Sequence, residues 1–191
     1  GYVFVTNDFK ANVLSVLIKW LLKISFSHPN KRVIFQNQDN LAGFRAHGLI
    51  DEANAVLIKG SGVDTHIFKP SPEPDSNPIV MVASRMLLDK GICEFVEAAR
   101  EIKSEGSKAR FVLVGDVDPE NPMTITVSQI KKWVEDGLIE WWGKQKNMAE
   151  VFSQVHIVSL PSYAEGLPKV LIEASACGRP IVTTDVSGCR E

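Results

Sequence analysis

Residues 155–183 read VHIVSLPSYAEGLPKVLIEASACGRPIVT. The apolar run Val155–Leu160 predicts a buried strand, and apolar residues recur at helical spacing over Lys169–Cys177. Pro168 stands in the first turn of that helix, where a proline is tolerated because the N–H that it lacks has no partner within the helix. A further apolar run, Ile181–Thr183, predicts another strand. Strand, helix and strand in this order predict a parallel βαβ unit.

The same alternation extends upstream of this unit. Strands are predicted at Ile79–Ala83, Phe111–Val114 and Leu138–Trp142, and helices at Ile92–Ile102, Val127–Leu138 and Met148–Phe152. Alternating strands and helices, with strands that are apolar on both faces, predict an α/β fold: a Rossmann-like parallel sheet with helices on both faces. Ligands bind such sheets at the carboxyl ends of the strands, so a site is expected in the loops that follow them.

An N-terminal region precedes this pattern and carries a shorter one. It predicts a helix around Val13–Ile24, a strand at Val33–Phe35, a helix at Asn40–His47 and a strand at Ala55–Ile58. The segment KPSPEPDSNP then has four prolines in ten residues, which forbid a helix or a central strand and predict a stiff linker. We therefore expect the end of one domain over residues 1–69, a linker over 70–78 and a second domain over 79–191.

The composition is that of an ordinary globular protein. The chain has 191 residues, is 45% hydrophobic and 23% charged, and carries a formal net charge of -2. A chain so close to neutral has no general field to attract nucleic acid, so a nucleic-acid partner is not expected. The chain begins at Gly1 rather than Met and ends just after a predicted strand, which indicates a piece of a longer protein.

Cysteine usage and hydropathy favour a cytoplasmic location. Three cysteines without a CxxC pair argue against a secreted disulfide framework and against a structural zinc site. The longest apolar stretch, Val13–Phe26, is broken by Lys19 and Lys23 and is too short to span a membrane. Two interpretations of this stretch stay open. It packs on its own sheet, which we favour, or it makes peripheral contact with a membrane through Trp20 and the two lysines.

A first candidate site follows the strand Ile79–Ala83, in the loop ASRMLLDKG. Arg85 and Lys90 place two cations beside the start of the next helix, and a helix N-terminus with added positive charge binds anions. A plainer interpretation is a capping Asp89 with solvated basic neighbours. The loop alone does not decide between the two.

A second candidate site follows the strand Val155–Leu160, in PSYAEGLPKVLIE. Gly166 allows close approach of the backbone to a ligand, and Pro168 leaves the next two N–H groups pointing at an anion. Glu173 lies about 7 Å further along the helix, within reach of ribose hydroxyls. Glu165, ahead of the helix, could accept a hydroxyl of a second sugar. The spacing suits a nucleotide-diphosphate sugar, although two glutamates taken alone would be more commonly solvent-exposed acids.

Together these residues resemble a known family, the retaining two-domain GT-B glycosyltransferases of family 4 in the glycosyl transferases group 1 class, of the bacterial surface-polysaccharide type. EGLPKVLIEASACGRPIVTTDVSGCRE resembles the family signature, with its E-x7-E motif at Glu165 and Glu173. ASRMLLDKG resembles the phosphate loop, with Ser84 where glycine is usual. VLIKGSGVDTHIFKP resembles the crossover between the two domains, and KRVIFQNQDNLAGF the end of the N-terminal domain.

The resemblance implies an enzyme that moves a sugar from a nucleotide-diphosphate sugar, commonly a UDP-sugar, to a glycan or lipid-linked acceptor in polysaccharide biosynthesis. By match of position, Arg85 and Lys90 bind the diphosphate and stabilise it as the leaving group, and Glu165 binds a sugar hydroxyl. The donor-binding residues are Gly166, Leu167, Pro168, Lys169 and Val170 through the backbone, and Glu173 at the ribose. The loop after Leu138–Trp142, near Gly143, would flank the base. The resemblance implies no metal and no further cofactor.

Other functions stay open. Complete enzymes of this class are about twice as long, so this chain is expected to bind a donor but to transfer little. A sugar-nucleotide 2-epimerase of the same fold and a non-catalytic nucleotide-binding module are the alternatives. The joint presence of Arg85, Lys90, Glu165 and Glu173 argues against the second. The donor base and sugar, the acceptor and the oligomeric state are not determined by the sequence.

Overall fold

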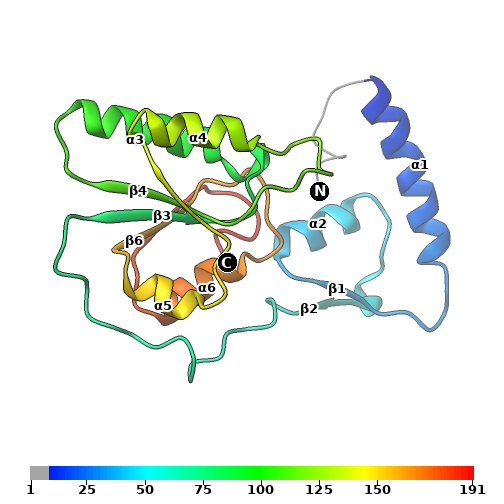
Figure 1. Ribbon diagram of the computed structural model, residues 1–191. Coiled ribbons are helices and arrows are strands. Elements are labelled where there is room, and N and C mark those ends of the chain that lie inside the picture. The colour runs from blue at the N-terminus through cyan, green and yellow to red at the C-terminus, as the bar shows by residue number, and fades with distance from the viewer. Residues whose placement is uncertain (1–8) are drawn as a thin grey trace. The chain divides into compact units, whose positions relative to one another are not determined.

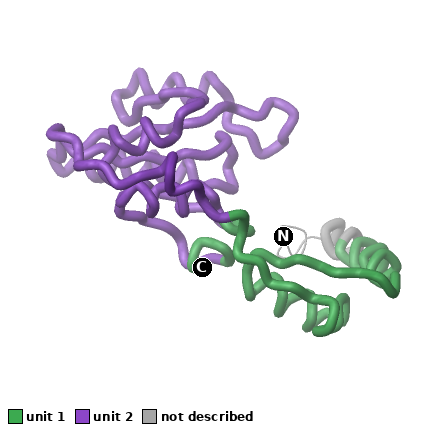
Figure 2. Tube along the Cα trace, turned by 90° about the horizontal axis from the view of Figure 1, so that it is seen from below, with its two compact units in different colours: residues 1–61, 164–167, 187–191 green, residues 62–163, 168–186 purple. Residues whose placement is uncertain are grey.

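The computed structural model describes residues 9–191, with side chains from Ser15 onward. The chain divides into two compact units (Figure 2). Unit 1 contains the chain up to Ser61 together with residues 164–167 and 187–191, and unit 2 contains residues 62–163 and 168–186. The division at Ser61 precedes the proline-rich segment, and the domain limits expected from the sequence stay a prediction.

Unit 1 is built around a short parallel sheet. Its elements are helix α1 (Phe9–Ser25), strand β1 (Val33–Phe35), helix α2 (Gln38–Ala46) and strand β2 (Ala55–Leu57). β1 and β2 pair in parallel, with Val33 opposite Ala55. Phe35, Leu41 and Ile50 form a small buried core beneath α2. The four elements predicted from the sequence are confirmed, with bounds that differ by a few residues.

Helix α1 does not bury the apolar stripe that the sequence gives it. Among its described side chains Trp20 is 60% exposed and Val16 is 68% exposed, and Leu17, Leu21 and Ile24 are exposed as well. The favoured interpretation, that this stripe packs on its own sheet, is therefore wrong for these five residues. Leu22, on the opposite side of the helix, lines a cavity together with residues of β1 and α2.

Unit 2 contains a five-stranded parallel sheet. Its strands are β3 (Ile79–Ala83), β4 (Arg110–Val114), β5 (Glu140–Gly143), β6 (Ile157–Leu160) and β7 (Ile181–Thr183). They lie in the order β5-β4-β3-β6-β7, and every neighbouring pair is parallel. The first strand in sequence is thus the central one, and the chain reverses its direction of winding between β3 and β6.

Helices cover both faces of this sheet. Helices α3 (Ile92–Ser104) and α4 (Val127–Glu135) lie on one face, and α5 (Met148–Ser153) and α6 (Lys169–Ala176) lie on the other (Figure 1). Because both faces are covered, the interior strands bury apolar side chains on both faces, and Met81, Val82 and Val112 have no exposed surface. The predicted α/β fold, a parallel sheet with helices on both faces, is confirmed.

The differences in element bounds have local causes. The helix predicted over Val127–Leu138 ends at Glu135, because Gly137 takes a left-handed φ of 70° that no helix continues. The N–H of Leu138 then bonds to the carbonyl of Trp133 at 3.0 Å, so this residue closes the helix instead of starting a strand. The strand accordingly begins at Glu140.

The proline-rich segment has no helix or strand, as predicted, but it is bound closely to unit 2. Arg179, only 3% exposed, donates from Nη2 to the carbonyls of Ser71 and Pro72, at 3.1 Å each. The imidazole of His156 bonds to the Pro74 carbonyl at 3.0 Å. These contacts make the segment a strap on the surface of unit 2.

Candidate functional site

A cavity of about 480 Å³ opens at the carboxyl edge of the sheet in unit 2. Its walls come from the loops that follow β3, β4 and β5 and from the first turns of α5 and α6. In a sheet of this order the loops separate to opposite faces where the winding reverses, here between β3 and β6, and leave a crevice between them. The fold therefore explains why a cavity stands at this edge.

The charged residues of the cavity come from three loops and one helix. Arg85 follows β3, Asp116 and Asp118 follow β4, Lys144 follows β5, and Glu173 lies on α6. Arg85 and Asp118 form an ion pair, with Nη1 and Oδ2 2.8 Å apart. Two cations thus stand among three carboxylates, a lining that can bind a phosphate and hydroxyl groups of the same ligand.

Backbone hydrogen bonds join the loop after β3 to the loop after β4. The N–H of Met86 donates to the Asp116 carbonyl at 3.0 Å, and the N–H of Ile125 donates to the Met86 carbonyl at 2.9 Å. Gly115 lies so close to the Ser84 carbonyl that a Cβ at this position would overlap it. These contacts give Arg85 and Asp118 a rigid base, since neither loop can move without the other.

Glu173 is a nearly buried carboxylate at the same cavity. It is 9% exposed and lies just past the first turn of α6, with Lys169 Nζ 3.5 Å from its carboxylate. The helix begins after Pro168, and no side chain caps its first N–H groups. Val170, from the same first turn, also lines the cavity. An open helix start and a carboxylate one turn inward are the arrangement that the sequence predicts for this loop.

Lys90 lies elsewhere. It belongs to a single 3-10 turn, Leu88–Lys90, that runs into α3, and it does not line the cavity. This turn is linked to the loop after β6, because the carbonyl of Asp89 accepts hydrogen bonds from Ser162 Oγ at 3.1 Å and from the Tyr163 N–H at 2.9 Å. The structure therefore brings Arg85, Val170 and Glu173 together at one cavity. Lys90 is close to Arg85 in the sequence but does not line this cavity.

The remaining residues of the second candidate site divide between the units. Glu165, Gly166 and Leu167 belong to unit 1, whereas Pro168 and Lys169 begin α6 in unit 2. Within unit 1 the carbonyl of Gly166 accepts a hydrogen bond from Asn37 Nδ2 at 2.6 Å. The stretch that the sequence presents as one loop is thus anchored at its two ends in different units.

Sequence reasoning missed several cavity residues, notably Asp116, Asp118, Lys144, Gln145 and Met148. The glycine and aspartate directly after β4 were a usable signal, because a polar loop after a buried strand marks the binding edge of such a sheet. Lys144 and Gln145, after β5, belong to the loop near Gly143 that the family resemblance places beside the base, although neither was predicted individually.

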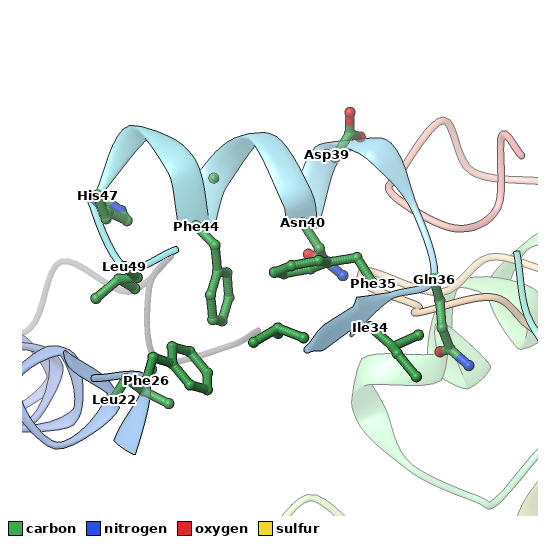
Figure 3. A pocket seen from close by; sticks show the side chains of 12 residues that line it. Leu22, Phe26, Ile34, Phe35, Gln36, Asp39, Asn40, Phe44, His47 and Leu49 are labelled. Atoms are coloured by element: carbon green, nitrogen blue, oxygen red, sulfur yellow. The ribbon is translucent and has the colours of Figure 1, made fainter. Parts of the chain in front are cut away.

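A second cavity, of about 650 Å³, lies within unit 1 between α1, β1 and α2 (Figure 3). Its walls are largely apolar and include three phenylalanines. The rings of Phe26 and Phe44 have centroids 6.3 Å apart, and those of Phe35 and Phe44 are 5.2 Å apart in an edge-to-face arrangement. None of the residues that line it was predicted as a site residue.

Two further properties concern the described part of the chain only. No group of three His, Cys, Asp or Glu side chains is arranged there to hold a metal ion, and the expectation of a metal-free site stays a prediction. No helix there has the length and the apolar character needed to cross a membrane.

Comparison with known proteins gives consistent matches. The model of the family described as glycosyl transferases group 1 matches residues 77–191. The chain is 34% identical, over its whole length, to the N,N'-diacetylbacillosaminyl-diphospho-undecaprenol alpha-1,3-N-acetylgalactosaminyltransferase of Campylobacter jejuni, and spans 52% of that protein. The chain thus spans about half the length of this curated relative.

Solved structures share the fold. The crystal structure of TarM matches 95% of this chain with a TM-score of 0.71 and 19% identity, over 34% of the TarM chain. Anabaena HepE in complex with UDP-glucose matches 84% of this chain with a TM-score of 0.67 and 20% identity, over 46% of the HepE chain.

Proposed function

Because the chain belongs to the glycosyl transferases group 1 family, we propose that it forms the donor-binding part of a glycosyltransferase that acts in bacterial glycan biosynthesis. The single observation that carries this proposal is the meeting of Arg85 and Glu173 at one cavity on the carboxyl edge of the sheet. A cation for phosphate and a buried carboxylate for ribose are the two polar contacts that a nucleotide diphosphate requires.

The reaction we propose breaks the bond between the anomeric carbon of a sugar and the diphosphate of its nucleotide. A new bond forms from that carbon to an acceptor hydroxyl oxygen, the hydroxyl proton is released, and the nucleoside diphosphate leaves, with retention at the anomeric carbon. Negative charge grows on the leaving phosphate, so a positive group already in place lowers the barrier. Arg85 and the start of α6 supply that charge at the cavity, Lys90 adds to it from the turn before α3, and the proposal needs no metal.

Roles for the other residues follow the family motif. Glu165 accepts a hydroxyl of the donor sugar, and Glu173 accepts the ribose hydroxyls. The N–H groups of Lys169 and Val170 at the start of α6 bind the phosphate, those of Gly166 and Leu167 bind the donor sugar, and Pro168 has none. Uridine is the base we propose, since HepE binds UDP-glucose. The acceptor we propose is lipid-linked, because the C. jejuni relative is named for a diphospho-undecaprenol acceptor.

Isothermal titration of the chain with UDP, GDP and ADP tests the proposal. We expect saturable binding of UDP, weakened at least about tenfold by Glu173→Ala and by the double change Arg85→Ala with Lys90→Ala. The matched control is Glu97→Ala, which removes an exposed carboxylate on α3 that pairs with Arg100. Failure of a folded chain to bind any of the three nucleotides would contradict the donor role.

Product analysis separates the proposed enzyme from its alternatives. A transferase releases UDP and joins the sugar to an acceptor, with the anomeric configuration of the donor, whereas a 2-epimerase leaves a UDP-sugar of inverted C2. A nucleotide-binding module changes neither compound. For the 191-residue chain alone we expect donor binding with little or no transfer, because closure of the two parts of such an enzyme completes its site.

We place the enzyme on the cytoplasmic side, in peripheral contact with the membrane through α1. Trp20 and Leu17 are exposed on this helix, which carries Lys19 and Lys23 and no acidic residue. Apolar and cationic side chains on one helix favour an anionic lipid surface. Co-sedimentation with anionic vesicles, lost in Leu17→Glu with Trp20→Glu and absent with neutral vesicles, is the expected result. Equal sedimentation of wild type and variant would contradict the contact.

A further inference from the structure

Asn37 is a fully buried polar residue at the start of α2, with no exposed surface. Its Oδ1 accepts the N–H of Asn40 at 2.8 Å and caps the helix. A cap requires only this oxygen. The other half of the amide, Nδ2, donates to the carbonyl of Gly166 at 2.6 Å and approaches that of Glu165 at 3.5 Å. The amide nitrogen therefore serves the loop that carries Glu165, independently of the helix.

The loop that Asn37 contacts lies close to Gln36 and, backbone to backbone, to Gly188. A Cβ on Gly166 would lie 2.5 Å from Gln36 Oε1, and a Cβ on Gly188 would lie 2.7 Å from the Glu165 carbonyl oxygen. The Gln36 side chain can move away from a Cβ on Gly166, whereas the Glu165 backbone cannot move away from one on Gly188, so Gly188 is the position that excludes a side chain. The carbonyls that Asn37 contacts are thus enclosed by unit 1 rather than left to solvent.

The next two residues of α2 hold a different stretch. The N–H of Gln38 donates to Glu191 Oε1 at 3.1 Å, and Asp39 Oδ2 accepts from Ser187 Oγ at 2.9 Å and from Arg190 Nη1 at 3.1 Å. Asp39 projects from the outer side of the first turn of α2 (Figure 3). Consecutive residues at one helix start therefore bind the segment after β6 and the segment after β7.

A held carbonyl also fixes an N–H, because the peptide unit is planar. The carbonyl of Glu165 shares its plane with the N–H of Gly166, and the carbonyl of Gly166 shares its plane with the N–H of Leu167. The hydrogen bonds from Asn37 therefore determine the direction of two N–H groups of the loop as well as the direction in which the Glu165 side chain leaves it.

We propose that Asn37 is a positioning residue that holds Glu165 and the N–H groups of Gly166 and Leu167 in place for the donor sugar. This inference rests on the proposed function, which makes these groups the sugar contacts. Asn37 itself touches no substrate in this role. The nucleotide contacts, Arg85 and Glu173, belong to unit 2 and do not depend on it.

The test uses two changes at this position and a matched control. Asn37→Ser keeps an oxygen for the helix cap but is too short to reach Gly166, and Asn37→Asp keeps the shape and the cap oxygen but removes the donor. Asn54 is also in unit 1, and its Oδ1 accepts a bond from Arg32 at 3.0 Å away from the loop. Asn54→Ser and Asn54→Asp therefore make the same substitutions at an asparagine that does not contact the loop at Gly166.

Two measurements are made on each variant. Hydrogen exchange at the Gly166 and Leu167 amides is expected to accelerate at least about fivefold in both Asn37 variants and to be unchanged in both Asn54 variants. By titration, the affinity for UDP is expected to stay within about twofold of wild type, while the extra affinity of UDP-N-acetylgalactosamine or UDP-glucose over UDP falls about fivefold.

Unchanged exchange at these two amides would overturn the inference, and so would equal weakening of UDP and UDP-sugar, which a general loss of stability produces. If the unchanged chain binds no nucleotide, the proposed function and the sugar-positioning role fail together. The exchange result is independent of nucleotide binding, so it shows separately whether Asn37 holds the loop.

Discussion

Arg85 and Asp118 form an ion pair across the cavity mouth, with Nη1 and Oδ2 2.8 Å apart. The Arg85 side chain is 62% exposed and that of Asp118 is 30% exposed, so the pair lies on the solvent side of the two joined loops. The guanidinium that we propose for the diphosphate is thus already paired with a carboxylate of its own chain. An incoming phosphate must compete with that carboxylate or share the guanidinium with it.

Replacing Asp118 by Asn is therefore expected to strengthen the binding of UDP. An exposed pair of this kind contributes about 0.2–1 kcal/mol, which corresponds to a gain of about 1.5-fold to fivefold in affinity. Titration calorimetry at low salt measures it, and Asp136→Asn, at the end of α4, is the control. A loss of affinity would mean that Asp118 orients Arg85 instead of competing for it.

Glu173 is expected to act through the ribose hydroxyls. Removing a hydrogen-bonded carboxylate costs about 1.5–3 kcal/mol, so Glu173→Ala should weaken UDP about tenfold to a hundredfold. The affinity of wild type should fall by a similar factor when 2′,3′-dideoxy-UDP replaces UDP. The affinity of Glu173→Ala should hardly change on the same replacement. If removing the hydroxyls weakened binding by the same factor in Glu173→Ala as in wild type, the two losses would be independent. Glu173 would then not contact the ribose.

Arg179 is expected to be a large contributor to the stability of unit 2. Its Nε donates to the Phe152 carbonyl at 2.8 Å, and its Nη2 holds Ser71 and Pro72 of the strap. Arg179→Ala leaves the buried Phe152 carbonyl and the two half-buried bonds to the strap without their donor, at a cost of about 3 kcal/mol in the free energy of unfolding. Urea denaturation measures the change. Arg100→Ala, which breaks only an exposed pair on α3, is expected to change it by less than about 0.5 kcal/mol.

Comparable effects of the two arginine changes would show that the strap is not held by Arg179. Arg179→Lys provides a second comparison, because a lysine keeps the charge but cannot reach three carbonyls with a planar group. We expect it to recover only part of the stability.

The pair Arg110–Glu140 is expected to make stability depend on pH. Arg110 Nε and Nη2 donate to the two Glu140 oxygens at 2.7 and 2.8 Å, and these bonds, against some desolvation, lower the pKa of Glu140. A carboxyl with a lowered folded pKa stabilises the protein above its unfolded pKa of about 4.3. The contribution disappears as the pH falls through the folded pKa.

Glu140→Gln should therefore destabilise the chain near neutral pH and have no effect in acid. Both side chains are about 40% exposed, so solvent screening limits the cost to about 0.5 kcal/mol. Urea denaturation of both proteins from about pH 7 to about pH 3 is the measurement. A difference that stays constant across this range would assign the effect to packing rather than to charge.

The strands of unit 2 were predictable because their pattern is local. Ile79–Ala83 and Ile181–Thr183 have in the structure the bounds that the sequence predicts. Ile79–Ala83 is the central strand, and a parallel strand covered on both faces is apolar on both. The end of α4 was predicted too late, because the apolar period continues to Leu138 while the backbone has already turned at Gly137. The period of apolar residues reports side-chain burial and does not indicate where the backbone turns.

The site was predictable where the chain itself brings residues together. Glu173 and Val170 share one helix face, and Arg85 follows the neighbouring strand, so the sheet topology alone places them at one edge. The hydrogen-bond partners of Arg85 and Asn37 could not be predicted in this way. Asp118 and Gly166 are reached only by folding over 33 and 129 residues, and an asparagine before a helix predicts a cap but not where its nitrogen points.

The three separate stretches of unit 1 determine the order in which the chain can finish folding during synthesis. Asn37 leaves the ribosome 129 residues before Gly166, a delay on the order of ten seconds at usual elongation rates. Until then its amide has no native acceptor, and an unpaired buried amide is costly. The last contacts of unit 1 are therefore completed after those of unit 2, because unit 1 includes residues up to Glu191 whereas unit 2 ends at Val186.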